Sequence, residues 1–225
     1  MNDPLQRVFL VDDDPGVIKG LTRLLRAAGY DAVSFNSAQE FISRYNPDTP
    51  GCLILDISMP GITGLELQDW LMQTDSPLPV IFLTGHGDIP ASVQAMKRGA
   101  VDFLTKPVDE TDLFEAILEA SRRYRQQIAA RDQLKTIKAR LAMLTPRERQ
   151  VLEHVVDGKL NKQIADVLGT VEKTIKVHRA RVMRKMGVQS LAELVRLAER
   201  AGIGAAPPPG TASLQPPNPA GRWPE

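Results

Sequence analysis

The sequence predicts an α/β domain built on a five-stranded parallel sheet, followed by an all-α helix-turn-helix domain that a helical linker joins to it. Two observations carry this prediction. Five short apolar runs alternate with amphipathic stretches over the first 120 residues, and a short helix, a glycine turn and a basic helix follow between residues 158 and 187. At 225 residues the chain also exceeds the usual size of a single core.

The apolar runs have the length and composition of β-strands, and amphipathic segments typical of helices lie between them. The first, third and fourth runs are apolar almost throughout, as central strands covered on both faces are. Repeated strand–helix units of this kind predict a parallel sheet with helices on both faces. The five predicted strands are 7–11, 31–35, 52–55, 79–83 and 101–104.

The net charge of +1 conceals a strong asymmetry along the chain. Residues 1–121 hold 8 Lys and Arg against 18 Asp and Glu, residues 122–141 hold 7 against 1, and residues 142–203 hold 12 against 7. We therefore divide the chain into an α/β domain (1–121), a helical linker (122–141), a basic domain (142–203) and a tail (204–225). An acidic half joined to a basic half suggests a cation site on the first and a polyanionic partner for the second.

The linker and the tail differ in their expected order. From about Glu110 the sequence predicts one helix that continues through the basic stretch without Gly or Pro. Leu134, Ile137, Leu141 and Leu144 recur at helical spacing, which is compatible with a short coiled-coil seam. A plain helical linker is favoured, because a firm coiled-coil assignment needs about three or four heptads. The tail holds seven prolines and is predicted to be disordered.

Composition excludes several classes of protein. Cys52 is the only cysteine, so an intramolecular disulfide framework is excluded, and its apolar sequence neighbours favour a core position. No run approaches the roughly 18 apolar residues that a membrane span needs, and no signal-peptide pattern follows Met1. We expect a cytoplasmic protein with no membrane partner.

Two or three carboxylates are predicted to meet at one edge of the sheet. Asp12, Asp13 and Asp14 follow the first strand, and Asp56 ends the third. The carboxyl ends of parallel strands share the edge at which open α/β folds bind their ligands. Clustered carboxylates repel one another unless a cation neutralises them, and hard oxygen ligands suit Mg²⁺. Asp14, which precedes Pro15, fits a helix cap equally well.

A hydroxyl and an ammonium group are expected at the same edge. Thr84 follows the fourth strand, and Lys106 follows the fifth, just before Pro107. With a divalent cation, these groups would cradle a phosphoryl group. Asp56 could then act as a nucleophile that forms an aspartyl phosphate. The bond before Pro107 can be cis, which would aim the ammonium inward, although most such bonds are trans.

This pattern resembles the receiver domain of response regulators over residues 5–121. The segment MPGITG follows the third strand, and GHGDIPASVQAMKRGAVDFLTKP lies near the end of the domain. The other residues that carry the resemblance occur in order and are Asp12, Asp13, Asp56, Thr84, Lys106 and Pro107. The resemblance implies a flavodoxin-like fold and transfer of a phosphoryl group from a sensor histidine kinase onto Asp56.

The resemblance also implies roles for single residues. It places Mg²⁺ on the side chains of Asp13 and Asp56 and on the backbone carbonyl of Ser58, with Asp12 supporting the metal-bound waters. The phosphorylated receiver of this family exposes an altered surface, and that change promotes dimerisation.

A switch pair is implied in the same way. Thr84 moves its hydroxyl toward the phosphoryl group, and the ring of Phe103 turns inward. Taken alone, Phe103 would instead be assigned to the core. His86 lies in the loop after Thr84 and is expected to be an ordinary loop residue, because the receiver scheme needs no catalytic base.

The basic domain carries a helix-turn-helix pattern. Thr145, Pro146 and Glu148 have the spacing of a capping box with proline at the first helical position. The stretch NKQIADVLG predicts a second helix that ends at Gly169, and EKTIKVHRARVMRKM predicts a long third helix. In this arrangement the second helix of the pair, here the long basic one, enters the major groove of DNA.

Helical spacing sorts this long helix into faces. Ile175, Val182 and Met186 form an inward stripe. The side chains that could meet base edges are Lys173, Lys176, Val177 and Ala180, and those suited to phosphate contacts are Thr174, His178, Arg181 and Lys185. His178 borders the inward stripe, so packing or hydrogen bonding explains it as well as a phosphate contact does. The alternative for the whole helix is a soluble basic helix that binds no DNA.

Residues 144–203 resemble the LuxR-type helix-turn-helix domain, and the pairing with a receiver resembles the FixJ branch of the NarL/FixJ family. The resemblance rests on GKLNKQIADVLGTVEKTIKVHRARVMRKMGVQSLAELVRLAERAGI. It implies a last helix at 190–200 that helps dimerisation, with base contacts from Lys176 and Val177. The implied DNA-backbone contacts are Thr174, His178, Arg181, Asn161 and Lys162. The segment GTV at 169–171 departs from the family, which often has isoleucine and then serine or proline there.

Together these features predict a phosphorylation-activated, DNA-binding transcription regulator and not an enzyme, apart from slow loss of its own phosphoryl group. The expected partners are a sensor histidine kinase, double-stranded promoter DNA, RNA polymerase and, after phosphorylation, a second copy of the chain. One alternative is a Mg²⁺-dependent phosphohydrolase, although Ser58 stands where such an enzyme carries its second carboxylate. Another is a sigma-factor-like module, because LTPRERQVL also resembles sigma region four.

Overall fold

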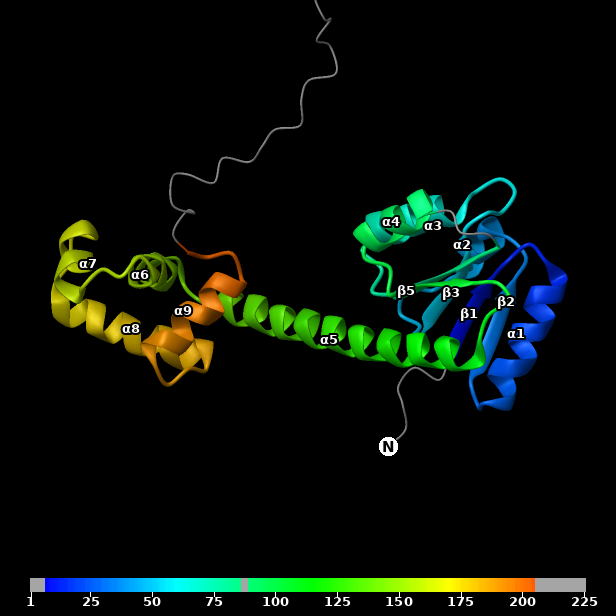
Figure 1. Ribbon diagram of the computed structural model, residues 1–225. Helices are drawn as coiled ribbons and strands as arrows, with labels where there is room; N and C mark the ends of the chain where they lie inside the picture. The colour runs from blue at the N-terminus through cyan, green and yellow to red at the C-terminus, as the bar shows by residue number, and fades with distance from the viewer. Residues whose placement is uncertain (1–6, 86–88, 205–225) are drawn as a thin grey trace, which may run out of the picture. The chain divides into compact units, whose positions relative to one another are not determined.

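The computed structural model describes residues 7–85 and 89–204 and contains a five-stranded parallel sheet (Figure 1). The strands pair in the order β2-β1-β3-β4-β5, so the predicted fold class is confirmed. Each strand starts and ends within one residue of its predicted position. The strands are β1 (Arg7–Val11), β2 (Asp31–Phe35), β3 (Cys52–Asp56), β4 (Val80–Thr84) and β5 (Asp102–Thr105).

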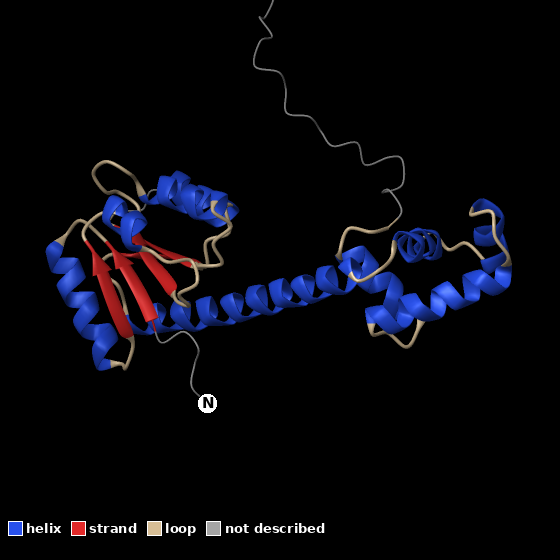
Figure 2. Cartoon of the chain, turned by 180° about the vertical axis from the view of Figure 1, so that it is seen from behind, coloured by secondary structure: helices blue, strands red, loops and turns tan. Residues whose placement is uncertain are grey.

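The chain forms two compact units, the first ending at Ala130 and the second starting at Arg131. The helices are shown in blue in Figure 2. They are α1 (Pro15–Ala27), α2 (Ala38–Arg44), α3 (Gly64–Gln73), α4 (Ile89–Lys97), α5 (Glu110–Ala142), α6 (Pro146–Val156), α7 (Asn161–Val167), α8 (Glu172–Met186) and α9 (Leu191–Arg200). Helix α5 is continuous across the boundary between the units.

Helices cover both faces of the sheet in the first unit. On one face, Phe41 of α2, Leu67 of α3 and Ala95 of α4 pack in one core cluster with side chains of the sheet. On the other face, Leu25 of α1 and Leu113 of α5 pack in a second cluster. Strands β3 and β4 are buried along their whole length, which is why they are apolar at every position except their last. Polar chemistry is thereby confined to the strand ends.

The second unit is built from α6 to α9 and the last turns of α5. Ile137 and Leu141 of α5 are buried in its core, and Leu144 packs against the same cluster. Three residues of the apolar stripe that was compatible with a coiled-coil seam, namely Ile137, Leu141 and Leu144, therefore pack inside this unit. The last third of the predicted linker therefore belongs to the core of the second unit, because its apolar side chains are buried in the same cluster as Val151 and Ile164.

Local signals in the sequence set several helix ends. The side chain of Thr145 accepts a hydrogen bond from the Glu148 backbone N–H, and the Glu148 side chain accepts one from the Thr145 N–H, which completes the predicted capping box. Helix α8 ends at Gly187, whose φ of 66° lies in the left-handed region that favours glycine. A Cβ atom at Gly187 would also lie 2.9 Å from the Arg140 guanidinium.

In the part of the chain that the structure describes, no helix is both long enough and apolar enough to cross a membrane. His86, predicted to be a loop residue, lies outside the described residues, as do positions 205–225 of the tail that was predicted to be disordered.

Candidate functional site

The carboxyl ends of β1 and β3 bring acidic side chains together. The two strands are neighbours in the sheet, so Asp12, directly after β1, lies beside Asp56 at the end of β3. Ligand oxygens of Asp12, Asp13 and Asp56 all lie within 4.8 Å of one another. Asp12 and Asp56 are buried, while Asp13 is exposed. The sheet thus gathers Asp12, Asp13 and Asp56 into one acidic pocket, as predicted.

This acidic pocket could bind Mg²⁺. Its donors are carboxylate oxygens, which Mg²⁺ prefers, and the exposed Asp13 leaves the pocket open to the water molecules that Mg²⁺ keeps. Burial raises the pKa of Asp56, the nearby charges of Asp12 and Asp13 raise it further, and Lys106 opposes the shift. A divalent cation would stabilise the ionised carboxylates, so the donor set fits the metal.

Lys106 joins the two buried carboxylates. Its Nζ lies 2.6 Å from Oδ2 of Asp12 and 3.1 Å from Oδ1 of Asp56. Burial alone would lower the pKa of this ammonium, but the hydrogen bonds to Asp12 and Asp56 outweigh burial and raise it. The peptide bond before Pro107 is cis. Because its pKa is raised, Lys106 stays protonated, and its positive charge compensates the negative charges of Asp12 and Asp56.

Thr84 and Phe103 lie on β4 and β5. Thr84 is buried at the end of β4, and its carbonyl accepts a hydrogen bond of 2.7 Å from the backbone N–H of Lys106. Phe103 is half-buried and packs against the sheet, with its ring centroid 6.5 Å from that of Phe82. A half-buried ring fits both interpretations that the sequence left open, namely the switch and the core.

The remaining predicted residues near the pocket have separate roles. Asp14 is the N-cap of α1, where its side chain accepts a hydrogen bond of 2.7 Å from the Gly16 N–H. This geometry supports the capping alternative for Asp14. Ser58 is exposed two residues after the end of β3.

Gly64 is a residue whose role the sequence did not reveal. A Cβ atom here would lie 2.2 Å from the carbonyl oxygen of Asp56 and 3.0 Å from Cα of Ile57. The Gly64 N–H also donates a hydrogen bond of 3.0 Å to the Ile57 carbonyl. The start of α3 is thus packed against the backbone of Asp56, and only glycine allows this approach.

We expect Gly64→Ala to lower the free energy of unfolding by about 1–3 kcal/mol, because the Asp56 backbone must move to admit the methyl group. It should also slow any reaction at the Asp56 carboxylate. Urea unfolding and acetyl phosphate labelling measure the two effects. Gly20→Ala is the control, since no atom lies within 4 Å of its added Cβ. Equal behaviour of the two variants would contradict the close approach at Asp56.

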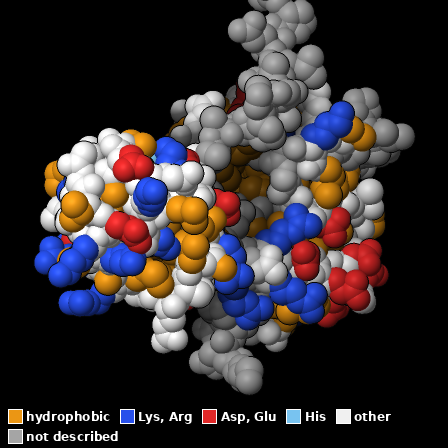
Figure 3. Space-filling view, turned by 90° about the vertical axis from the view of Figure 1, so that its left-hand side faces the viewer, with side chains coloured by type: hydrophobic (Ala, Val, Ile, Leu, Met, Phe, Trp, Pro, Cys, Tyr) orange, Lys and Arg blue, Asp and Glu red, His pale blue; other side chains and the backbone are white. Residues whose placement is uncertain are grey.

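The predicted long helix of the basic domain is α8, and its apolar stripe faces inward as predicted. Ile175, Val182 and Met186 are buried in the core of the second unit. Figure 3 shows the side of the second unit that carries α7 and α8, where Lys and Arg side chains lie among hydrophobic and a few acidic ones. The exposed side chains of the predicted DNA-binding set are Lys162, Lys173, Lys176, Val177 and Arg181, and the half-buried ones are Asn161, Thr174, His178 and Lys185.

Asn161 and His178, two of the half-buried residues, differ in their hydrogen bonding within the second unit. Oδ1 of Asn161 accepts a hydrogen bond of 2.6 Å from Arg179, which ties α7 to α8. Nδ1 of His178 is buried and has no hydrogen-bond partner among the described residues. The departure at 169–171 leaves Val171 as the N-cap of α8 without a side-chain hydrogen bond.

Lys185 has a different partner from the one that helical spacing suggested. Its Nζ lies 2.6 Å from Oε2 of Glu148 and donates a hydrogen bond to the Met143 carbonyl. The ammonium therefore neutralises a buried carboxylate inside the unit. We leave Lys185 out of the DNA interface proposed below for this reason.

Further residues, which the sequence did not single out, hold α7 and α8 in place. Arg140 of α5 donates a hydrogen bond of 2.7 Å to the Met186 carbonyl at the end of α8. Arg147 of α6 donates one to the Leu168 carbonyl at the end of α7. These arginines are far from their partners in the sequence, so no local pattern indicates them.

Glu148 makes the stability of the second unit depend on pH. Its side chain is 3% exposed. The hydrogen bond from Lys185 lowers the pKa of Glu148 most, and the hydrogen bond from the Thr145 N–H lowers it further. A lowered pKa in the folded state stabilises the unit above the ordinary pKa of 4.5, and this contribution is lost as the pH falls through the folded-state value.

We expect Glu148→Gln to lower the free energy of unfolding by about 1–2 kcal/mol at neutral pH, since the partly exposed Lys185 limits the loss. The difference from the wild type should shrink as the pH falls below 4.5. Urea unfolding from pH 7 down to about pH 3 measures it, with the exposed Glu153→Gln on the same helix as the control. A difference that stays constant with pH would contradict the charged pair.

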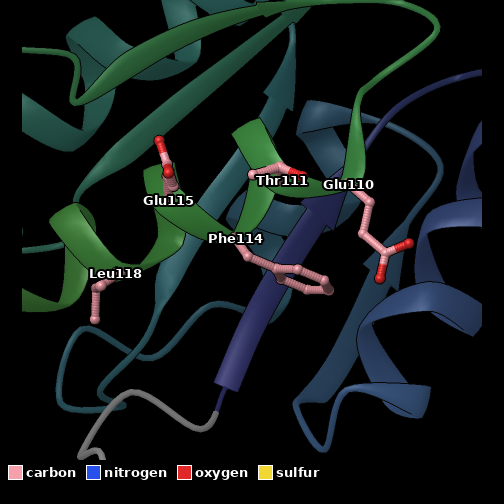
Figure 4. Close-up of a pocket in the computed structure, with 5 residues that line it drawn as sticks. All are labelled: Glu110, Thr111, Phe114, Glu115 and Leu118. Carbon is pink, nitrogen blue, oxygen red and sulfur yellow. The ribbon is translucent and has the colours of Figure 1, made fainter.

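A cleft of about 420 Å³ lies along the first turns of α5 (Figure 4). It is lined by Glu110, Thr111, Phe114, Glu115 and Leu118. None of these residues belongs to the predicted site, and the cleft supplies no group to the acidic pocket.

Both halves of the chain match known protein families. Residues 8–118 match the model of the response regulator receiver domain, and residues 142–198 match that of the bacterial regulatory proteins of the luxR family. Nodulation protein W of Bradyrhizobium diazoefficiens is 43% identical over 198 residues, which cover 88% of this chain and 87% of that protein. The transcriptional regulatory protein FixJ of the same organism is 43% identical over 197 residues, covering 87% and 96%.

A solved structure agrees with these matches. The response regulator StyR superposes with a TM-score of 0.72 at 44% identity, covering 86% of this chain and 98% of that one. The similarity therefore covers residues of both the first and the second unit.

Proposed function

The chain belongs to the response regulators that join a receiver domain to a LuxR-type DNA-binding domain, and on this premise we propose how its residues act. The protein is a phosphorylation-dependent transcription regulator and not a catalytic enzyme, and a sensor kinase and DNA are its partners. In our proposal it works in the cytoplasm, where both partners are within its reach.

Asp56 is the phosphoacceptor in this proposal. The observation that carries the assignment is the bridge from Lys106 to the two buried carboxylates, because it shows a charge-compensated pocket around Asp56. A carboxylate oxygen of Asp56 attacks the phosphorus of the kinase phosphohistidine, the phosphorus–nitrogen bond breaks, and an aspartyl phosphate forms.

Lys106, Thr84 and Phe103 respond to the new group. Phosphorylation adds a charge of roughly −1.5 to −2, so the Lys106 ammonium turns from the carboxylates to the phosphoryl oxygens. The hydroxyl of Thr84 follows, and the half-buried ring of Phe103 moves inward, toward the core cluster that contains Phe82. The equilibrium between the resting and the active arrangement shifts by the difference in free energy with which the two arrangements bind the phosphoryl group.

The acidic pocket would hold Mg²⁺ when the protein accepts the phosphoryl group. Asp13 and Asp56 would supply side-chain ligands, Ser58 would supply its backbone carbonyl, and Asp12 would support the waters of the cation. When bound, the cation offsets the negative charge of the phosphoryl group.

Helix α8 binds the major groove of promoter DNA. Lys176 and Val177 contact base edges, and the neighbouring Lys173 lies on the same exposed face. Contacts to the DNA backbone come from Thr174, His178, Arg181, Asn161 and Lys162, which lie on α7 and α8. Phosphorylation promotes dimerisation, so that two such units bind two half-sites, and the bound dimer then acts on RNA polymerase.

Substitution of the phosphoacceptor tests the assignment. We expect Asp56→Asn to abolish incorporation of phosphate from acetyl phosphate in the presence of Mg²⁺, because the amide is not a nucleophile. Phosphate incorporation is measured by intact mass, and the exposed Asp48→Asn is the control. Labelling of Asp56→Asn at the wild-type level would refute the assignment.

A further inference from the structure

Glu172 forms an ion pair with a residue that we assign to base contacts. Its Oε1 lies 3.0 Å from Nζ of Lys176, one helical turn along α8. The side chains are 47% and 64% exposed, so the pair lies on the surface. Glutamate four residues before lysine is the favourable order for such a pair.

A carboxylate at this position is costly for a helix that binds DNA. Glu172 is the only acidic residue in the sequence of α8, which otherwise carries six Lys and Arg. DNA bears one negative charge per roughly 1.7 Å of axis, so a carboxylate at its surface is repelled. Glu172 also lies in the first turn, and in helix-turn-helix proteins the first residues of the recognition helix contact the bases.

Helix stability alone offers a simpler explanation. An acidic side chain in the first turn interacts favourably with the helix dipole, and Val171 provides no side-chain cap at this end of α8. That explanation predicts an effect of Glu172 on unfolding, but none on which DNA sequence is bound. The two explanations therefore differ in a measurable way.

We propose that Glu172 is a specificity-determining residue that acts with Lys176. The carboxylate accepts a hydrogen bond from the amino group of a cytosine, and the Lys176 ammonium donates to O6 or N7 of a guanine. The ion pair keeps the ammonium over the base edges and away from the phosphates. Residues four apart on a helix are about 5–6 Å apart at Cβ, which suits the same or the next base pair. The inference rests on the proposed function of α8.

The test is selection of bound sequences from randomised double-stranded DNA by the phosphorylated full chain. Three proteins are compared: the wild type, Glu172→Gln, and Glu153→Gln as a control that removes an exposed carboxylate from α6. We expect Glu172→Gln to reduce the preference for cytosine at one position about tenfold and to favour adenine there, because glutamine pairs with adenine through two hydrogen bonds. Glu153→Gln should keep the wild-type preferences.

The remaining outcomes are also decisive. If Glu172→Gln binds every sequence more tightly by one factor and keeps the wild-type base preferences, the carboxylate only repels phosphates and the inference is overturned. Unchanged preferences with a lower midpoint of thermal unfolding would assign Glu172 to helix stability and would also overturn it. A wild type that selects no sequence at all would instead refute the proposed function of α8.

Discussion

Replacement of Lys106 by methionine is expected to make the receiver depend on Mg²⁺ for its stability. Without the ammonium, the buried carboxylates of Asp12 and Asp56 lose their compensating charge. Removing one partner of a buried ion pair costs about 3–5 kcal/mol, and partial exposure of Lys106 places the expected loss near the lower end of this range. A divalent cation between the carboxylates should recover part of it.

Urea unfolding of Lys106→Met with EDTA and with Mg²⁺ measures this effect. The wild type should gain less from Mg²⁺ than the variant does, because Lys106 already occupies part of the pocket. The exposed Lys97→Met serves as the control for loss of a lysine from the same unit. If Mg²⁺ stabilises Lys106→Met no more than the wild type, the carboxylates do not share a cation site.

The same substitution should separate phosphorylation from its consequence. Asp56 keeps its carboxylate in Lys106→Met, so acetyl phosphate can still modify it. The variant cannot form the ion pair between Lys106 and the phosphoryl oxygens, which favours the active arrangement. Phosphorylation should therefore no longer raise its DNA affinity. Wild-type activation of the modified variant would show that Lys106 has no part in the switch.

Removal of Arg181 is expected to weaken binding to all DNA sequences by a similar factor. Arg181 is exposed on α8 and is assigned to a phosphate. Each phosphate contact contributes about 0.9 to the slope of log affinity against log salt concentration, so Arg181→Ala should reduce the slope by about 1. We expect its affinity to fall about tenfold near 0.1 M salt.

Fluorescence anisotropy with labelled duplexes between about 0.05 and 0.3 M salt provides the slope. Arg23→Ala, which removes an exposed arginine from α1, controls for the change in net charge. An unchanged slope would place Arg181 away from the DNA backbone. A loss confined to one sequence would assign it to base recognition instead.

The sequence predicted the sheet and the acidic pocket well for a physical reason. Strands buried on both faces must be apolar along their length, so the first polar residue of each run marks the strand end. Asp12 and Asp56 are therefore placed by the strands themselves, and their neighbouring strands bring them together. Lys106 directly follows β5 and lies at the same edge.

Contacts between distant segments could not be predicted in this way. Helical spacing placed Lys185 with the side chains suited to phosphate contacts. In the folded unit, its ammonium donates a hydrogen bond to Glu148, which lies 37 residues earlier in the chain. Ile137 and Leu141 formed an apolar stripe whose partner the sequence left open, and the core of the second unit supplies it. Gly64 is required by the clearance to Asp56, a distance that exists only in three dimensions.

One measurement tests the link between the two halves most directly. The DNA affinity and the oligomeric state of the full chain are determined with and without acetyl phosphate and Mg²⁺, in parallel with Asp56→Asn. We predict that the wild type dimerises and binds its selected DNA more tightly only after phosphorylation, and that Asp56→Asn does neither. If both proteins bind DNA equally well under every condition, Asp56 does not control DNA binding and the account is contradicted.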